Sequence, residues 1–158
     1  MSRLALALTV LLAGNAGAQT STRYINPPGL AKPTGYTHVV VSPDQRTAYI
    51  AGQVALDSAG KLVGADDFKA QAEQVFVNLR RALAGAGASL GQVMKTTTYI
   101  TDARHIPALR EIRNRHLGPI DPPASTLLIV SGLARLELLI EIEAVAALRP
   151  PVIRELRE

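Results

Sequence analysis

Two short stretches near the C-terminus carry side chains that could do chemistry. The stretch PPASTLLIVSG offers Ser125 and Thr126 before a run of aliphatic residues, and IEIEA places Glu141 and Glu143 in alternation with apolar residues. Alternate residues of a strand point to the same side, so these two carboxylates would lie about 7 Å apart on one face. Such a pair can split its pKa values and supply a general acid or base. A strand that faces solvent shows the same pattern.

Ser125 and Thr126 would point to opposite faces of their strand, where each could donate a hydrogen bond to a ligand. They could equally satisfy backbone groups at the start of the strand. A serine nucleophile needs a base, and no Asp-His pattern stands near Ser125 in the sequence to supply one. A distant base stays open as an alternative.

Metal and cofactor sites are not indicated by the sequence. The three histidines lack metal-ligand spacing, and there is no cysteine. The glycine-containing stretch GAGAS follows a predicted helix instead of opening one, which is typical of a helix end and not of a phosphate loop. We therefore expect neither a metal nor a cofactor.

The composition is typical of one globular domain. The 158 residues are 47% hydrophobic and 19% charged, which is enough to bury a core. We assign residues 19–148 to this domain and residues 149–158 to a tail. The formal net charge of +4 is spread along the chain and 4% of the residues are aromatic, so the sequence indicates no nucleic-acid partner.

Residues 1–18 have the three parts of a secretory signal peptide. A basic start, MSR, precedes the apolar stretch LALALTVLLAG, and a small-residue A-x-A pattern ends at Ala18. The apolar stretch is shorter than the roughly 20 residues that span a bilayer, although an uncleaved N-terminal anchor is the alternative. We expect an exported protein, periplasmic or secreted, with no stable membrane association after residues 1–18 are removed.

Hydrophobic periodicity predicts the elements that position the candidate residues. Residues 19–36 carry prolines and glycines and form an extended lead-in, after which two strands flank a tight turn at SPDQR. Apolar residues at helical spacing predict a long helix from Phe68 to Leu83. VMKTTTYIT predicts a strand with Met94 and Thr96 on one face. HIPALREIRNRHLG predicts a second helix, and STLLIVSG and LELLIEIEAVAAL predict the last two strands.

The predicted order is β-β-α-β-α-β-β, an α+β fold with a mixed sheet. We expect both helices to pack on one face of the sheet. The other face, expected to be rich in Val, Ile and Leu, would then be uncovered, and an uncovered apolar face favours self-association.

Four segments in the right order resemble the YjgF/RidA family from about Tyr24 to Leu148. They are YINPPGLAKPTGYTHVV, YIAGQVALD, NLRRALAGAGASLGQVMKTTTYITD and IEIEAVA. The resemblance implies a chorismate-mutase-like fold, a homotrimer whose sheets form a central barrel, and three ligand clefts between subunits. In the best-known branch of the family, the cleft hydrolyses reactive enamines and imines to 2-keto acids and ammonia.

The resemblance also implies which residues line the cleft. Glu141 matches the position expected to orient the hydrolytic water, and Tyr36 matches a tyrosine at the cleft mouth. Gly52 and Gln53 match a glycine-containing strand end, where a bare backbone N–H can approach the ligand. The alternatives are a rim aromatic at the trimer interface for Tyr36 and a bulge glycine for Gly52.

The chain departs from the family where a carboxylate clamp is expected. In the family, an arginine follows a Pro-Ala pair and holds the substrate carboxylate. Here Ser125 follows that pair. Arg110 stands where the second helix is expected to carry a polar residue, often asparagine, and it could supply the missing charge or simply be solvated.

Two functions follow from these observations. The first is an enzyme that hydrolyses small enamines or imines between subunits, with Glu141 as acid or base and Ser125 and Thr126 as hydrogen-bond donors. The second is a trimer that binds a small molecule such as an imino or keto acid, or acts as a holdase, without catalysis. The absent arginine and the expected export favour the second.

Overall fold

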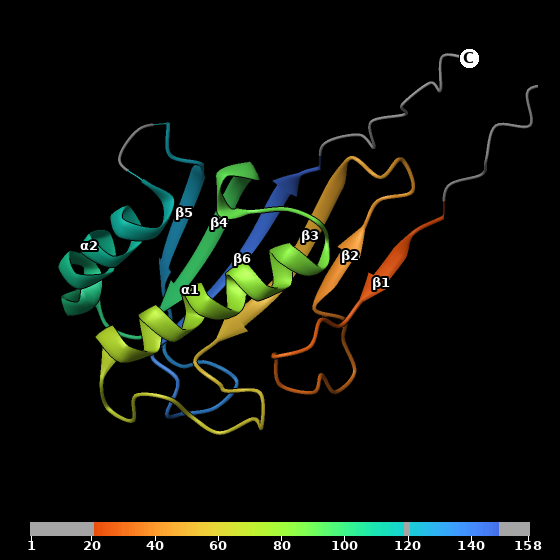
Figure 1. Cartoon of the computed structure of the whole chain (residues 1–158). Coiled ribbons are helices and arrows are strands. Elements are labelled where there is room, and N and C mark those ends of the chain that lie inside the picture. The colour runs from red at the N-terminus through yellow and green to blue at the C-terminus, as the bar shows by residue number, and fades with distance from the viewer. Residues whose placement is uncertain (1–20, 119–120, 149–158) are drawn as a thin grey trace, which may run out of the picture.

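A mixed sheet with two helices on one of its faces forms the molecule (Figure 1). The computed structural model describes residues 21–118 and 121–148, so the predictions for residues 1–18 and for the tail 149–158 lie outside it. In the described part the strand order is β1-β2-β3-β6-β4-β5. The strands are β1 (Arg23–Ile25), β2 (Val39–Val41), β3 (Thr47–Val54), β4 (Val93–Ile100), β5 (Ala124–Ile129) and β6 (Ile140–Ala147).

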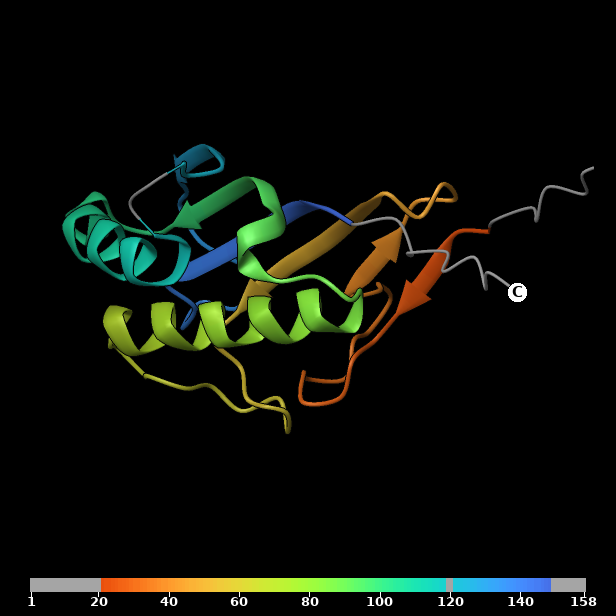
Figure 2. The same cartoon turned by 45° about the horizontal axis from the view of Figure 1, so that its top comes forward.

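The two helices are the crossover connections of the sheet. They are α1 (Phe68–Gly85) and α2 (Ile106–Leu117), and short 3₁₀ turns, η1 (Leu90–Gln92) and η2 (Ala103–His105), precede β4 and α2. β4 and β5 run parallel, which requires a crossover such as α2, whereas the other neighbouring strands are antiparallel. Figure 2 shows both helices on the same side of the sheet. The predicted α+β fold is confirmed.

The structure corrects the predicted elements at two places. β1 lies inside the stretch predicted as a lead-in without a strand, and it pairs Arg23 with Val41 and Ile25 with Val39. The order therefore starts with three strands instead of two. Met94 was expected to share a face with Thr96, but a β-bulge follows Val93 and leaves Met94 49% exposed. A bulge adds one residue to a strand, which ends strict alternation.

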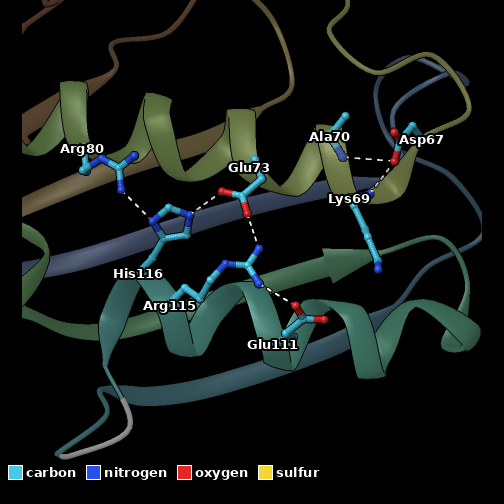
Figure 3. Close-up of polar contacts among 8 residues, drawn as sticks. All are labelled: Asp67, Lys69, Ala70, Glu73, Arg80, Glu111, Arg115 and His116. Atoms are coloured by element: carbon cyan, nitrogen blue, oxygen red, sulfur yellow. Dashed lines mark hydrogen bonds and ion pairs between the residues drawn. The ribbon is translucent and has the colours of Figure 1, made fainter.

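Helix α1 is held by its cap and by its buried face. The Asp67 carboxylate accepts hydrogen bonds from the backbone N–H groups of Lys69 and Ala70, at 3.0 and 3.1 Å (Figure 3), which satisfies donors that a helix start leaves free. The face against the sheet buries Val75, Phe76, Leu79 and Leu83, each no more than 1% exposed. This layer between α1 and the sheet is the hydrophobic core.

The face of the sheet opposite the helices is more polar than predicted. Its central strands present Tyr49, Lys95, Thr97, Tyr99, Glu141 and Glu143. The expectation of a face rich in Val, Ile and Leu is therefore wrong, because the isoleucines of β3 and β6, Ile50, Ile140 and Ile142, are buried towards the helices, whereas Val145 lies on the open face. Exposed aliphatic side chains gather instead on the edge strand β5, where Leu127, Leu128 and Ile129 are 40%, 40% and 55% exposed.

Neither helix of the described residues is long and apolar enough to cross a membrane.

Candidate functional site

The carboxylate of Glu141 lies directly over a bulge in the neighbouring strand. Glu141 is on the open face of β6, and the register of β3 against β6 shifts between Ile50 and Gln53. This irregularity brings Gly52 under the glutamate. A Cβ atom added to Gly52 would lie 1.8 Å from Glu141 Oε1. Gly52 therefore lies in a bulge, the alternative stated for it, and the group that approaches its backbone is the carboxylate of this same chain.

The surroundings of Glu141 favour its protonated form. Burial raises the pKa of Glu141, and the nearby Glu143 carboxylate raises it further. The pKa of the Tyr36 hydroxyl is raised as well, first by burial and then by Glu141, which places the two side chains near each other. No lysine, arginine or histidine of residues 21–118 and 121–148 forms an ion pair with Glu141. A raised pKa suits a carboxyl group that takes and gives protons.

Gln53, next to Gly52 in β3, is held in place by hydrogen bonds. Its side chain is 2% exposed, and its Nε2 donates to the carbonyl of Ala51 at 2.9 Å and lies 3.4 Å from Nδ1 of His38. His38 in turn lies 2.9 Å from the Ala31 carbonyl through Nε2. A small hollow of about 20 Å³ is lined by Tyr36, Gly52 and Gln53 together. Of the predicted residues, the structure thus brings Tyr36, Gly52, Gln53 and Glu141 into one corner, which we call the Glu141 corner.

Arg110 and Ser125 lie elsewhere, where both line a cavity of about 260 Å³ between α2 and the strands β4 and β5. Ser125 lies level with Thr96 on the helix face of the sheet, and its Oγ accepts a hydrogen bond from Thr96 Oγ1 at 3.5 Å. Arg110 is exposed on α2. We call this space the α2–β5 cavity. Its lining consists of Phe76, Thr96, Thr98, Leu109, Arg110, Arg113, Leu117, Ser125, Leu127 and Ile142.

Thr126 belongs to neither group. It pairs with Thr97, which is level with Glu143 on β6, so it lies on the open face of the sheet. Ser125 is on the helix face and Glu141 on the open face. Within a single chain, Ser125 and Glu141 therefore lie on opposite faces of the sheet.

Sequence reasoning missed Arg113. It lines the α2–β5 cavity three residues after Arg110, and residues at this spacing are neighbours on a helix surface. The spacing of the two arginines was therefore the signal that could have found it. A third hollow, of about 340 Å³, lies on the open face and includes Lys95 and Glu143 in its lining.

In the described residues, no three His, Asp or Glu side chains gather as a metal site would require.

The model of the family described as "Endoribonuclease L-PSP" matches residues 29–148. The chain belongs to the YjgF/RidA family. Protein DfrA of Myxococcus xanthus is 32% identical over 111 residues, which are 70% of this chain and 83% of that protein. A RutC family protein of Pyrococcus abyssi is 34% identical over 98 residues, which are 62% of this chain and 76% of that protein.

Solved structures of the YjgF/RidA family share the fold. RidA from the Antarctic bacterium Psychrobacter sp. PAMC 21119 superposes with a TM-score of 0.70 at 30% identity, covering 79% of this chain and 98% of that one. YyfA of the Rid family from Yersinia pestis gives a TM-score of 0.75 at 25% identity, covering 81% of this chain and 100% of that one. The chorismate-mutase-like fold implied by the resemblance is confirmed.

Proposed function

We propose that this member of the YjgF/RidA family hydrolyses small reactive imines or enamines, with Glu141 as the acid and base. One observation supports the proposal above all. The Glu141 carboxyl is half-buried with a raised pKa, and it lies over Gly52 and near Tyr36. A carboxyl group in this state can exchange protons with a water or a substrate nitrogen.

The reaction requires a water molecule and one protein group that takes and gives protons. Water attacks the carbon of the C=N bond, and the Glu141 carboxylate takes the proton that the water loses as the C–O bond forms. Protonated Glu141 gives that proton to nitrogen, which completes a neutral carbinolamine. Glu141 then takes the hydroxyl proton of the carbinolamine and passes it to the amino group, so that the C–N bond breaks as the C=O bond forms and ammonia leaves the keto product. An enamine enters the same path after it is protonated at carbon. A raised pKa helps both steps, because it brings the two protonation states of Glu141 closer in free energy at neutral pH.

A site that uses both groups of residues needs a second copy of the chain, so we further propose that the cleft forms between copies in a homotrimer. Glu141 and Ser125 lie on opposite faces of the sheet. All six residues of the edge strand β5 are exposed, which supports a contact there. Sedimentation should show a trimer, and a monomer would contradict this assembly.

The test of catalysis follows keto-acid formation from 2-iminopropanoate generated in situ. We expect activity in the native protein and a loss of about 10²- to 10⁴-fold in Glu141→Gln, the range for a general acid or base. Glu137→Gln, at an exposed glutamate that pairs with Arg135 outside the Glu141 corner, is the control and should keep most of the activity. A native protein without activity would overturn the proposal.

The α2–β5 cavity favours a second candidate, a trimer that only binds a small molecule. Ser125→Arg separates the two candidates. An inactive native protein that gains activity with Ser125→Arg would show a scaffold that binds a ligand without this chemistry.

A further inference from the structure

His38 is a buried histidine at the Glu141 corner, and the steps of the proposed reaction do not use it. It is 4% exposed, and it lines the small hollow together with Tyr36, Gly52 and Gln53. Its ring meets the Tyr36 ring edge to face, with the centroids 5.2 Å apart and an angle of 80° between the planes. The place of the Tyr36 side chain therefore depends on where His38 lies.

The hydrogen bonds of His38 determine which ring nitrogen carries the proton. Nε2 lies 2.9 Å from the Ala31 carbonyl oxygen, and a carbonyl oxygen can only accept, so Nε2 is the donor. In the neutral ring Nδ1 is then an acceptor, and the side-chain Nε2 of Gln53 lies 3.4 Å from it. That amide nitrogen has two hydrogens and also donates to the Ala51 carbonyl at 2.9 Å. The neutral ring therefore matches both of its neighbours.

The two neighbours bonded to the His38 ring belong to different parts of the Glu141 corner. Ala31 lies in the stretch between β1 and β2 that also carries Tyr36. Gln53 lies at the end of the β3 bulge that the Glu141 carboxylate covers. The His38 side chain therefore bonds the stretch that carries Tyr36 to the bulge beneath the glutamate.

We propose that His38 is a positioning residue for the Glu141 carboxyl group, and that its neutral imidazole holds Tyr36 and the β3 bulge in place. One donor and one acceptor on the same ring fix both parts of the corner at once. In this role His38 exchanges no proton with the substrate. The inference rests on the proposed function and deepens it, because it names what holds the acid and base of that reaction in position.

Loss of the two ring bonds would loosen both parts of the corner. The Ala31 carbonyl and the Gln53 amide would shift to find other partners, since polar groups left unpaired away from water cost free energy. Tyr36 would then leave its place near Glu141, and the bulge beneath the carboxylate would be held less firmly. A catalytic group that is displaced by a small distance loses much of its effect.

Two substitutions at His38 separate hydrogen bonding from packing. Glutamine has an amide donor and an amide acceptor at about the reach of the two ring nitrogens, so His38→Gln can keep both bonds. His38→Leu fills much of the same space without either bond. The backbone link from the Ala51 N–H to the His38 carbonyl, at 3.0 Å, remains available in both variants.

Keto-acid formation from 2-iminopropanoate measures the effect on the reaction. We expect kcat to fall about tenfold in His38→Leu, while KM changes little, because the catalytic group is displaced and not the binding surface. His38→Gln should recover most of the native kcat. His105→Leu is the control: His105 stacks on Phe68 with the ring centroids 4.2 Å apart, outside the lining of the hollow, and this variant should keep the native kcat.

The Tyr36 hydroxyl reports the same change without any substrate. Its pKa is raised by burial first and by Glu141 second, so a Tyr36 side chain that leaves this place should form its phenolate at a lower pH. Alkaline absorbance titration, with Tyr36→Phe to identify the signal, should show this shift in His38→Leu and not in His38→Gln or His105→Leu. A residue that contributes only to stability would lower the melting temperature of His38→Leu and leave kcat and the Tyr36 titration as in the native protein.

If His38→Leu does not fold, Gln53→Met provides the same test, because it removes the amide bonded to His38 Nδ1 and leaves the bond to Ala31. It should lower kcat and shift the Tyr36 titration in the same directions. A native kcat and a native Tyr36 titration in the folded variant would overturn the proposal, as would a His38→Gln variant that is as impaired as His38→Leu. A native protein that forms no keto acid, with the Tyr36 shift still present in His38→Leu, would contradict only the proposed function and would support the link through His38.

Discussion

Two glutamates, Glu73 and Glu141, experience opposite environments in this fold. Glu73 on α1 meets two groups of α2: it accepts hydrogen bonds from the Arg115 guanidinium and from Nε2 of His116, the latter at 2.7 Å (Figure 3). Burial alone would raise the pKa of Glu73, but these two partners outweigh it and lower the pKa. Glu141 has Glu143 nearby instead of a cation, and its pKa is raised.

The difference separates a structural carboxylate from one available for chemistry. The bonds of Glu73 are made within the chain and join the two helices, so a ligand would have to replace them. The charge of Glu141 is disfavoured where it stands, which keeps its protonation state open to change. A raised pKa in a half-buried carboxyl group is thus the feature that distinguishes the Glu141 corner from the ion pairs of the helices.

The largest effect is expected when the Glu141 corner is disturbed without touching Glu141. Gly52→Ala would put a Cβ atom 1.8 Å from Glu141 Oε1. Because this oxygen is the far end of a flexible side chain, the carboxylate should move while the fold survives. We expect keto-acid formation to fall about 10²-fold, the cost of a small misplacement of a catalytic group.

Gly91→Ala is the control for this change, since the nearest atom to its added Cβ would be Ser89 Oγ at 3.9 Å, an ordinary van der Waals contact. It should leave both activity and stability close to native. If Gly52→Ala kept full activity, the position of the Glu141 carboxylate would not matter for the chemistry.

The next effect concerns stability at Glu73. Glu73→Gln removes the charge that pairs with Arg115 and His116, and it should lower the free energy of unfolding by about 0.5–1 kcal/mol, the range for partly exposed ion pairs. The side chain of Glu73 is 42% exposed and that of Glu111 is 63% exposed. Urea denaturation should therefore show a smaller loss for Glu111→Gln. A larger loss for Glu111→Gln would contradict the view that the ion pairs of Glu73 are the ones that join α1 to α2.

The two carboxylates should change stability in opposite directions with pH. The lowered pKa of Glu73 gives stability that is present above the ordinary glutamate value of 4.5 and is lost as pH falls through the folded pKa. The raised pKa of Glu141 gives stability that is present below 4.5 and is lost as pH rises through the folded pKa.

The free energy of unfolding of two variants, measured across a range of pH, tests these opposite dependences. Relative to the native protein, Glu73→Gln should be less stable at neutral pH, and Glu141→Gln should be more stable there. The Glu141→Gln difference should shrink as the pH falls through the raised folded pKa towards 4.5, whereas the Glu73→Gln difference should shrink only as the pH falls below 4.5. Parallel slopes for the two variants would contradict the comparison.

Local patterns were sufficient to predict most of the elements. The apolar spacing of α1 and the Gly118 end of α2 depend on neighbours within a few residues, and both appear as predicted. Pairing register depends on residues far apart in sequence, and there the predictions failed. β1 forms only by pairing with β2, and the bulge before Lys95 arises from the pairing of β4 with β6.

The site was predictable only in part for the same reason. Alternation placed Glu141 and Glu143 on one face, as expected. The bulge that brings Gly52 under Glu141 is set by the pairing of β3 with β6 and leaves no mark in the sequence beyond the glycine itself. The place of Arg113 in the lining of the α2–β5 cavity likewise became visible only in the structure.

The smallest expected effect is a spectroscopic one at Tyr36. The pKa of its hydroxyl is raised from 10.0, by burial first and by Glu141 second. Glu141→Gln removes the second cause, so the phenolate of Tyr36 should form at a lower pH than in the native protein but still above the ordinary tyrosine range. Alkaline absorbance titration measures this, and Tyr36→Phe identifies the signal among the four tyrosines. If Glu141→Gln left the titration unchanged, Glu141 would not affect the pKa of Tyr36. The two side chains would then not act together in the Glu141 corner.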